Sequence, residues 1–204
     1  LFAMHYPKNS DFILWQPITH MFMHGDITHI LFNMFGLWMF GTPLEQMWGK
    51  QKFIFFYLSA GFGAVLIQTL VYNYDVMSVT QILIDNGLTN TDVNNFFKTG
   101  RLNTSLIQSV GEETLYSGIQ SFKAVMVGAS GALYGILVGF AMLFPNVQLM
   151  LLFPPIPIKA KFLVPLLILF DLFFGFTSYS VGPIAHFAHI GGAITGFIMM
   201  WYWK

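Results

Sequence analysis

Residues 124–144 read AVMVGASGALYGILVGFAMLF, an uncharged apolar stretch in which glycine recurs at positions 131, 135 and 139. About 20 mostly apolar residues are enough for a helix to cross a lipid bilayer. Glycines spaced four residues apart lie on one face of a helix, where they let a second helix approach closely. The stretch therefore predicts a membrane-spanning helix with one small-residue face.

Four further apolar stretches accompany it: His20–Phe40, Phe53–Tyr72, Phe162–Phe176 and Ile184–Trp203. The chain is 55% hydrophobic and 9% charged, against about 25% charged residues in a typical soluble domain. We therefore expect an all-α, polytopic membrane bundle with five visible spans, forming a single domain over residues 1–204. A net charge of zero argues against nucleic acid as a partner. The absence of cysteine excludes disulfides and thiolate metal sites.

Lysines orient this bundle. With five spans, one side of the membrane carries a cluster of lysines, namely Lys50, Lys52, Lys159, Lys161 and Lys204. Because positive loops stay on the cytoplasmic side, residues 1–19, 73–123 and 177–185 face outward. The 73–123 segment is rich in Asn, Thr and Ser. We expect it to be a polar, outward-facing insert whose amphipathic helices rest on the membrane surface.

Polar groups within hydrocarbon are costly, so each one needs a reason. His29 and Asn33 are four residues apart and share one helix face. Both side chains can donate hydrogen bonds to one oxyanion. They could equally form hydrogen bonds with neighbouring helices that stabilise the bundle. These two residues alone do not distinguish a catalytic role from this structural one.

A second cluster is Gly128-Ala129-Ser130-Gly131, with Tyr134 one turn beyond the serine. A serine flanked by small residues is open to close approach by a substrate carbonyl. Helix packing by itself also explains the small residues, so this motif is weak evidence when taken alone.

A third cluster is His189 with Gly192 and Gly196. These glycines are expected to pack against Gly131 and Gly135, which would bring His189 beside Ser130 as a base beside a nucleophile. His186 is the alternative partner, but only His189 has glycines three and seven residues later. No acidic residue adjoins His189 in the sequence to orient its ring.

In combination, the three clusters resemble the rhomboid family of intramembrane serine proteases. That family carries a His-x-x-x-Asn pair, a Gly-x-Ser-Gly motif followed by Tyr, and a His-x-x-Gly-x-x-x-Gly motif, in this order. Two flanking features agree, namely Glu45 with Gly49, and Asp171. Trp15-Gln16 stands where the family often has Trp-Arg, and Gln16 is a departure because it removes a cation from the outer loop. The family core has six helices, so we expect that its first helix is missing before residue 1.

The resemblance implies that Ser130 attacks the scissile carbonyl and that His189 is its base, in a Ser–His dyad. It implies an oxyanion hole formed by the Ser130 backbone N–H with His29 and Asn33, supported by Gly128, and a Tyr134 ring packed beneath the imidazole. It implies no cofactor and no metal. The substrates would be transmembrane proteins in the lipid bilayer, entering past the fourth span under a lid at Ser178–Ala185. The expected location is the cell inner (plasma) membrane, with the active site open to the outer, periplasmic side.

Two other classes of function compete with this one. A non-catalytic rhomboid-like scaffold or chaperone would lack the serine or the histidine, and both are present here. A transporter or channel would suit intramembrane His, Asn and Asp residues, but the sequence shows no internal repeat of the kind that many transporters carry. Asp171 is expected to be a buried structural group.

Overall fold

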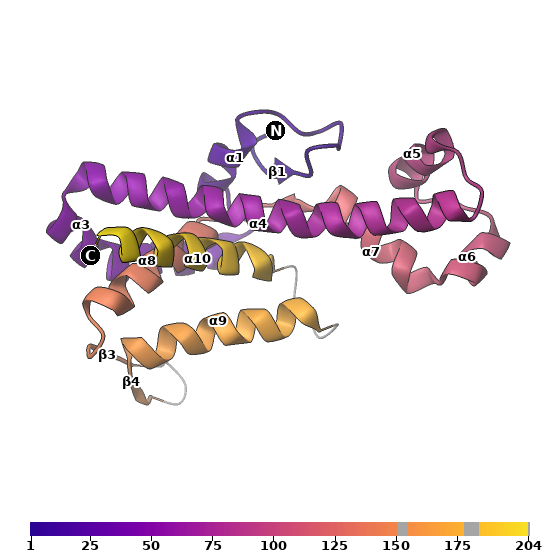
Figure 1. Ribbon diagram of the computed structural model, residues 1–204. Helices are drawn as coiled ribbons and strands as arrows, with labels where there is room; N and C mark the ends of the chain where they lie inside the picture. Colours follow the sequence, from indigo (N-terminus) through magenta and orange to yellow (C-terminus); the bar gives the residue numbers. More distant parts are fainter. Residues whose placement is uncertain (151–154, 178–183, 204) are drawn as a thin grey trace.

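The computed structural model describes residues 1–150, 155–177 and 184–203, and helices dominate it (Figure 1). This confirms the all-α class. In chain order the helices are α1 (Gln16–Thr19), α2 (Ile27–Gly36), α3 (Thr42–Trp48), α4 (Lys50–Asp85), α5 (Asn90–Thr99), α6 (Thr104–Val110), α7 (Glu112–Lys123), α8 (Ser130–Leu143), α9 (Ala160–Phe176) and α10 (His186–Trp203). A 3-10 turn, η1 (His20–Phe22), follows α1, and a π-helical turn, η2 (Leu37–Gly41), joins α2 to α3.

Two short antiparallel ladders connect distant parts of the chain. Strand β1 (Met4–His5) pairs with β2 (Val125–Met126), and β3 (Gln148–Met150) pairs with β4 (Pro157–Lys159). The first ladder ties the N-terminal segment to the residues just before α8. It thereby fixes the entry to the helix that carries Ser130.

Two expected helices begin later than the sequence indicated. The first begins at Ile27 rather than His20, because Asp26 caps it by accepting a hydrogen bond from the backbone N–H of His29 at 2.8 Å. The third begins at Ser130 rather than Ala124, because Val125 and Met126 are extended in β2. Apolar composition alone does not separate a strand from the helix that follows it.

Helix α4 is much longer than the expected Phe53–Tyr72. It continues to Asp85 over 36 residues, about 54 Å at 1.5 Å per residue, whereas the hydrocarbon core of a bilayer is about 30 Å thick. Helices α5 and α7 pack against its second half (Figure 1). The residues that they bury together are Val76, Val79, Leu83, Val93, Phe96, Phe97 and Leu115. The 73–123 segment thus begins inside a helix and has a hydrophobic core of its own.

Much of the surface of the other helices is apolar. Large side chains that are roughly half or more exposed include Phe32, Phe35, Trp38, Phe55, Leu66, Phe162, Phe173 and Trp201. Such a surface is suited to lipid rather than to water. Among the described residues, one helix, α4, is both long and apolar enough to cross a membrane, and α8 is apolar but shorter.

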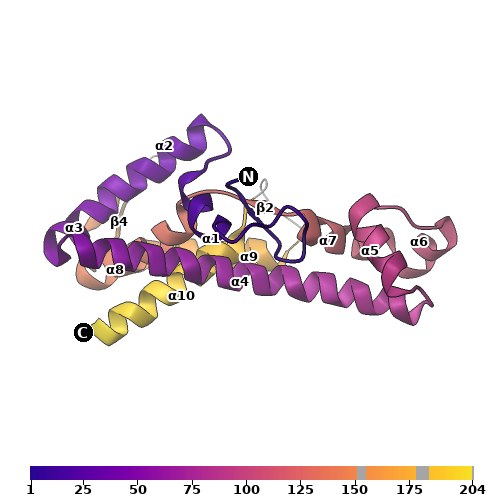
Figure 2. The ribbon, with the colours of Figure 1, turned by 90° about the horizontal axis from the view of Figure 1, so that it is seen from above.

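Helices α4, α8 and α10 all pack against one another (Figure 2). Glycines set the spacing between α8 and α10. A Cβ built on Gly196 would lie 2.6 Å from Cα of Gly135, and one built on Gly135 would lie 3.0 Å from the carbonyl oxygen of Gly192. A Cβ on Gly192 would overlap the carbonyl oxygen of Gly131. The two backbones are therefore in direct contact along these four glycines.

Candidate active site

Ser130 is the first residue of α8, and the segment before it is held in place from both sides. Gly128 has φ +122°, a conformation that glycine adopts far more readily than other residues. Its backbone N–H donates to the carbonyl of His20 at 3.0 Å. The first backbone N–H groups of a helix have no intrahelical partner, and the helix dipole makes this end positive. The serine is therefore placed where an anion would be stabilised.

His189 lies beside the serine, on the first turn of α10. Its Nε2 is 2.9 Å from Oγ of Ser130, which is hydrogen-bonding distance. The ring of Tyr134 stacks on the imidazole with centroids 4.3 Å apart and planes 8° from parallel. The stacking restricts the imidazole to one plane, and the close contact of α8 with α10 sets its distance from the serine.

Asp171 corrects the expectation that no carboxylate orients His189. Its Oδ1 lies 3.0 Å from Nδ1 of His189 and 2.6 Å from Nδ1 of His186, and the residue is only 5% exposed. The hydroxyl of Tyr134 also hydrogen-bonds this carboxylate. The sequence concealed the contact because Asp171 lies on α9, 18 positions before His189. The sequence did contain one indication of a functional role, because a carboxylate within an apolar span is energetically costly.

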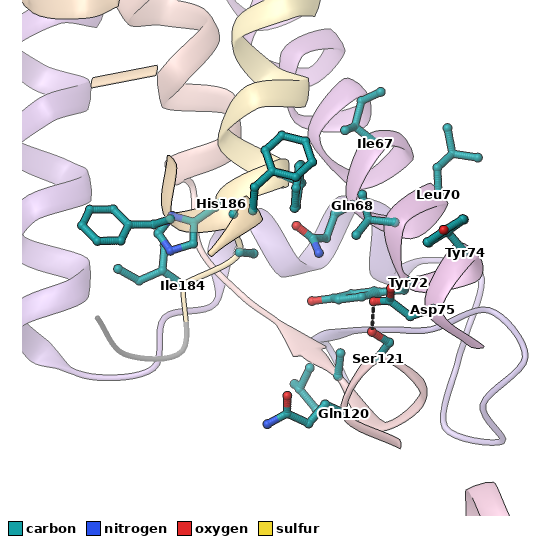
Figure 3. Close-up of a pocket in the computed structure, with 18 of the residues that line it drawn as sticks. Ile67, Gln68, Leu70, Tyr72, Tyr74, Asp75, Gln120, Ser121, Ile184 and His186 are labelled. Carbon is teal, nitrogen blue, oxygen red and sulfur yellow. Dashed lines mark hydrogen bonds between the residues drawn. The ribbon is translucent and has the colours of Figure 1, made fainter. Parts of the chain in front are cut away.

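His186, the alternative partner of the serine, faces Asp171 instead. Its Nε2 is buried and has no hydrogen-bond partner among the described residues. It also lines an open groove of about 1150 Å³ between α4, α7, the end of α9 and the start of α10. Figure 3 shows this groove, with the bond between Ser121 and Asp75 at 2.6 Å on one side and His186 on the other. Ser130 does not line the groove, so the groove opens beside His186 and not onto the serine.

His29 and Asn33 reach the site to different extents. A Cβ built on Gly128 would lie 2.7 Å from Nε2 of His29 and 3.6 Å from Oγ of Ser130, so the His29 ring is next to the backbone that precedes the serine. Asn33 is buried, and its amide donates to the carbonyl of His29 at 2.9 Å. One of its two amide hydrogens is thus bonded within its own helix.

Gln68 on α4 is a positioning residue that the sequence analysis did not single out. It is 4% exposed, and its Oε1 accepts a hydrogen bond from the backbone N–H of Ala188 at 3.0 Å. The same N–H also donates to the carbonyl of Ala185 at 2.9 Å, so Gln68 is a second acceptor for an N–H in the first turn of α10, one residue before His189. A glutamine within an apolar span was again the available signal.

The arrangement as a whole suits acid–base and nucleophilic chemistry by side chains. No group of three His, Cys, Asp or Glu residues with metal-binding geometry occurs in the described ranges 1–150, 155–177 and 184–203. Most of the lid expected at Ser178–Ala185 lies outside these ranges, because residues 178–183 are not described.

The chain is similar to known proteins over most of its length. The chain matches the family model of the rhomboid domain over residues 11–82 and 96–204. It is 26% identical over 185 residues to the RHOMBOID-like protein 6, mitochondrial, of Arabidopsis thaliana, a match that covers 91% of this chain and 42% of that protein. It is 26% identical over 188 residues to Rhomboid protein 1, mitochondrial, of Saccharomyces cerevisiae, covering 89% of this chain and 39% of that protein.

A bacterial relative matches a shorter part. Rhomboid protease GlpG of Haemophilus influenzae is 32% identical over 73 residues, which are 35% of this chain and 38% of that protein. The chain spans about two fifths of the length of each of these three relatives.

Proposed function

The chain belongs to the rhomboid family, and from this premise we propose that it is an intramembrane serine endopeptidase. Ser130 is the nucleophile and His189 is its general base. The observation that carries the proposal is the 2.9 Å contact between Oγ of Ser130 and Nε2 of His189. A nucleophile within hydrogen-bonding reach of a base, which is in turn held by further groups, is the pattern of covalent catalysis.

The geometry supports a two-step hydrolysis. Oγ of Ser130 attacks the carbonyl carbon of the scissile peptide while Nε2 of His189 takes the hydroxyl proton. The same proton then passes to the leaving amine, and the serine is left as an ester. A water molecule, deprotonated by His189, hydrolyses the ester and releases the second product.

Oxyanion stabilisation falls to the groups around the start of α8. In this proposal the backbone N–H of Ser130 and the side chain of His29 donate hydrogen bonds to the developing negative charge, and Asn33, one turn further along α2, supports them. Loss of one such donor typically lowers the rate about 100- to 1,000-fold. Gly128 allows the His29 ring to come this close, since a side chain at that position would overlap it.

The substrates in this proposal are transmembrane segments of other proteins, cleaved in or near the bilayer. The rhomboid family is membrane-embedded, and the exposed apolar side chains of this chain match that environment. The cell inner (plasma) membrane and the outward-facing site remain predictions. Two of the relatives are named as mitochondrial, which makes a mitochondrial membrane the competing location.

Turnover of a model transmembrane substrate by the purified protein tests the proposal. Ser130→Ala and His189→Ala should each abolish cleavage and labelling by a fluorophosphonate. Ser109→Ala, an exposed serine on α6, is the matched control and should behave like the unmodified protein. Full cleavage by Ser130→Ala would exclude the serine mechanism. A folded protein that neither cleaves nor reacts would instead favour the non-catalytic scaffold or chaperone.

A further inference from the structure

We propose that Asp171 is a positioning residue for His189, so that the site operates as a Ser130–His189–Asp171 relay rather than as a dyad. The inference rests on the proposed protease function and concerns what orients and charges its base. It begins from the contact at 3.0 Å between Oδ1 of Asp171 and Nδ1 of His189.

The burial of Asp171 requires an explanation. The residue is 5% exposed on α9, a helix with no other charged side chain after Lys161. A buried carboxylate is costly unless hydrogen-bond donors compensate it. Here two imidazoles and the Tyr134 hydroxyl supply those donors. Three of the groups around the carboxylate thus come from the helices that carry the serine and its base.

The bonds to Asp171 determine which nitrogen of His189 carries the proton. An ionised carboxylate only accepts hydrogen bonds, so Nδ1 of His189 must donate. In the neutral ring, Nε2 is then left with its lone pair directed at Oγ of Ser130. This is the tautomer that a general base needs, and without Asp171 nothing else among the described contacts of Nδ1 selects it.

The charge of Asp171 matters as much as its position. When His189 takes the serine proton, the ring becomes an imidazolium cation next to the carboxylate. Opposite charges about 4 Å apart, in surroundings with an effective dielectric constant near 20, attract strongly enough to change a rate by about a thousandfold. His186 holds the same oxygen from the other side at 2.6 Å, which keeps the carboxylate from rotating away.

Asp171→Asn is the decisive variant, because the amide keeps an oxygen acceptor and nearly the same shape but removes the charge. We expect kcat to fall about a thousandfold while KM stays within about threefold and the melting temperature within a few degrees. Asp171→Glu keeps the charge and changes the shape, so it should be more active than the Asn variant. A purely structural role predicts the reverse order, because a longer side chain fits a close-packed site less well.

Lys161→Gln is the matched control on the same helix. Lys161 is exposed and touches none of the residues of the site, so removing its charge should leave activity within about tenfold of the unmodified protein. If Asp171→Asn is folded and also within tenfold, the inference is overturned. If the Asp171→Asn variant does not fold, the test is the turnover of a folded Asp171→Glu variant. Turnover of Asp171→Glu above that of Ser130→Ala supports the inference. Turnover of Asp171→Glu no higher than that of Ser130→Ala overturns it.

The outcome is separable from that of the proposed function. An inactive Ser130→Ala variant together with an active Asp171→Asn variant rejects the relay and keeps the protease. An active Ser130→Ala variant rejects the protease itself, and the relay with it.

Discussion

Substitution of Gly196 by alanine should loosen the seam between α8 and α10 that holds the serine and the histidine together. A Cβ at this position would meet three atoms of Gly135, at 2.6 Å from Cα, 2.7 Å from the carbonyl oxygen and 3.0 Å from the carbonyl carbon. All three are backbone atoms, so no side-chain rotation can relieve the overlap. The two helices have to separate by about 1 Å to reach an ordinary contact distance.

The magnitude is a balance of two effects. Overpacking typically costs about 1–3 kcal/mol, and a clash with backbone belongs at the upper end of this range. Alanine in place of glycine within a helix returns about 1 kcal/mol. The net loss of about 2 kcal/mol corresponds to a fall of about 4–8 °C in melting temperature for a chain of this size. A misplacement of about 1 Å at the site should also lower kcat about 100-fold.

Gly139→Ala is the matched control on α8. A Cβ there would lie 3.3–3.4 Å from the side chains of Leu44, Phe56 and Trp48, which can each move by a few tenths of an ångström. Its clash is small enough for the gain in helix propensity to offset it, so its melting temperature should stay within about 3 °C. Both variants are to be measured by thermal unfolding in detergent and by turnover of a model substrate. Equal melting temperatures and equal turnover for the two variants would refute the packing argument.

Three further predictions address other parts of the molecule. His29→Ala should lower kcat about 100- to 1,000-fold yet leave turnover above that of a serine-less variant, as measured by single-turnover kinetics. Hydrogen bonds from the Thr89 hydroxyl and backbone N–H hold the pKa of the Asp92 carboxyl below its ordinary value. Asp92→Asn should therefore speed amide exchange in α5 at neutral pH. The difference should begin to shrink as the pH falls below about 4, where the unfolded carboxyl protonates, and should vanish only below the lowered pKa of the folded carboxyl. A cysteine at Asn94 should react with a membrane-impermeant maleimide in intact cells while one at Lys159 should not, and the opposite result would reverse the orientation.

Local spacing was enough to predict the parts of the site that share a helix face. Ser130 and Tyr134 are four residues apart, so they lie on the same helix face. The tyrosine therefore contacts the same neighbouring side chain as the serine, one turn further along. Gly192 and Gly196 have the same spacing, and the glycines at 131, 135 and 139 form the one stripe of that spacing on α8 that can receive them. The contact between Ser130 and His189 followed from these two facts without knowledge of the loops between them.

Features that depend on distant contacts could not be predicted in this way. The helical rotation of α9 decides whether Asp171 faces lipid, a neighbouring helix or His189, and that rotation is set by packing and not by the local sequence. Helix α4 was cut short at Tyr72 because the polar residues that follow lower its hydropathy, although α5 and α7 supply a second core that keeps the helix intact to Asp85. The beginning of α8 depends on a strand partner more than 100 positions earlier in the chain.

The site is built with unequal restraint on its three helices. Helices α8 and α10 touch backbone to backbone through Gly135 and Gly196, which leaves little freedom to change the distance between Ser130 and His189. Among the described residues, α9 makes no glycine contact of this kind. Its polar attachment to the site is the carboxylate of Asp171, which meets His186, His189 and the Tyr134 hydroxyl. A displacement of α9 would therefore leave the nucleophile and the base together and remove only the group that orients the base. Packing between α8 and α10 thus fixes the distance between the serine and the histidine, whereas the charge on α9 activates the histidine. The Gly196 variant should therefore lower both stability and turnover. The Asp171 variant should lower turnover alone.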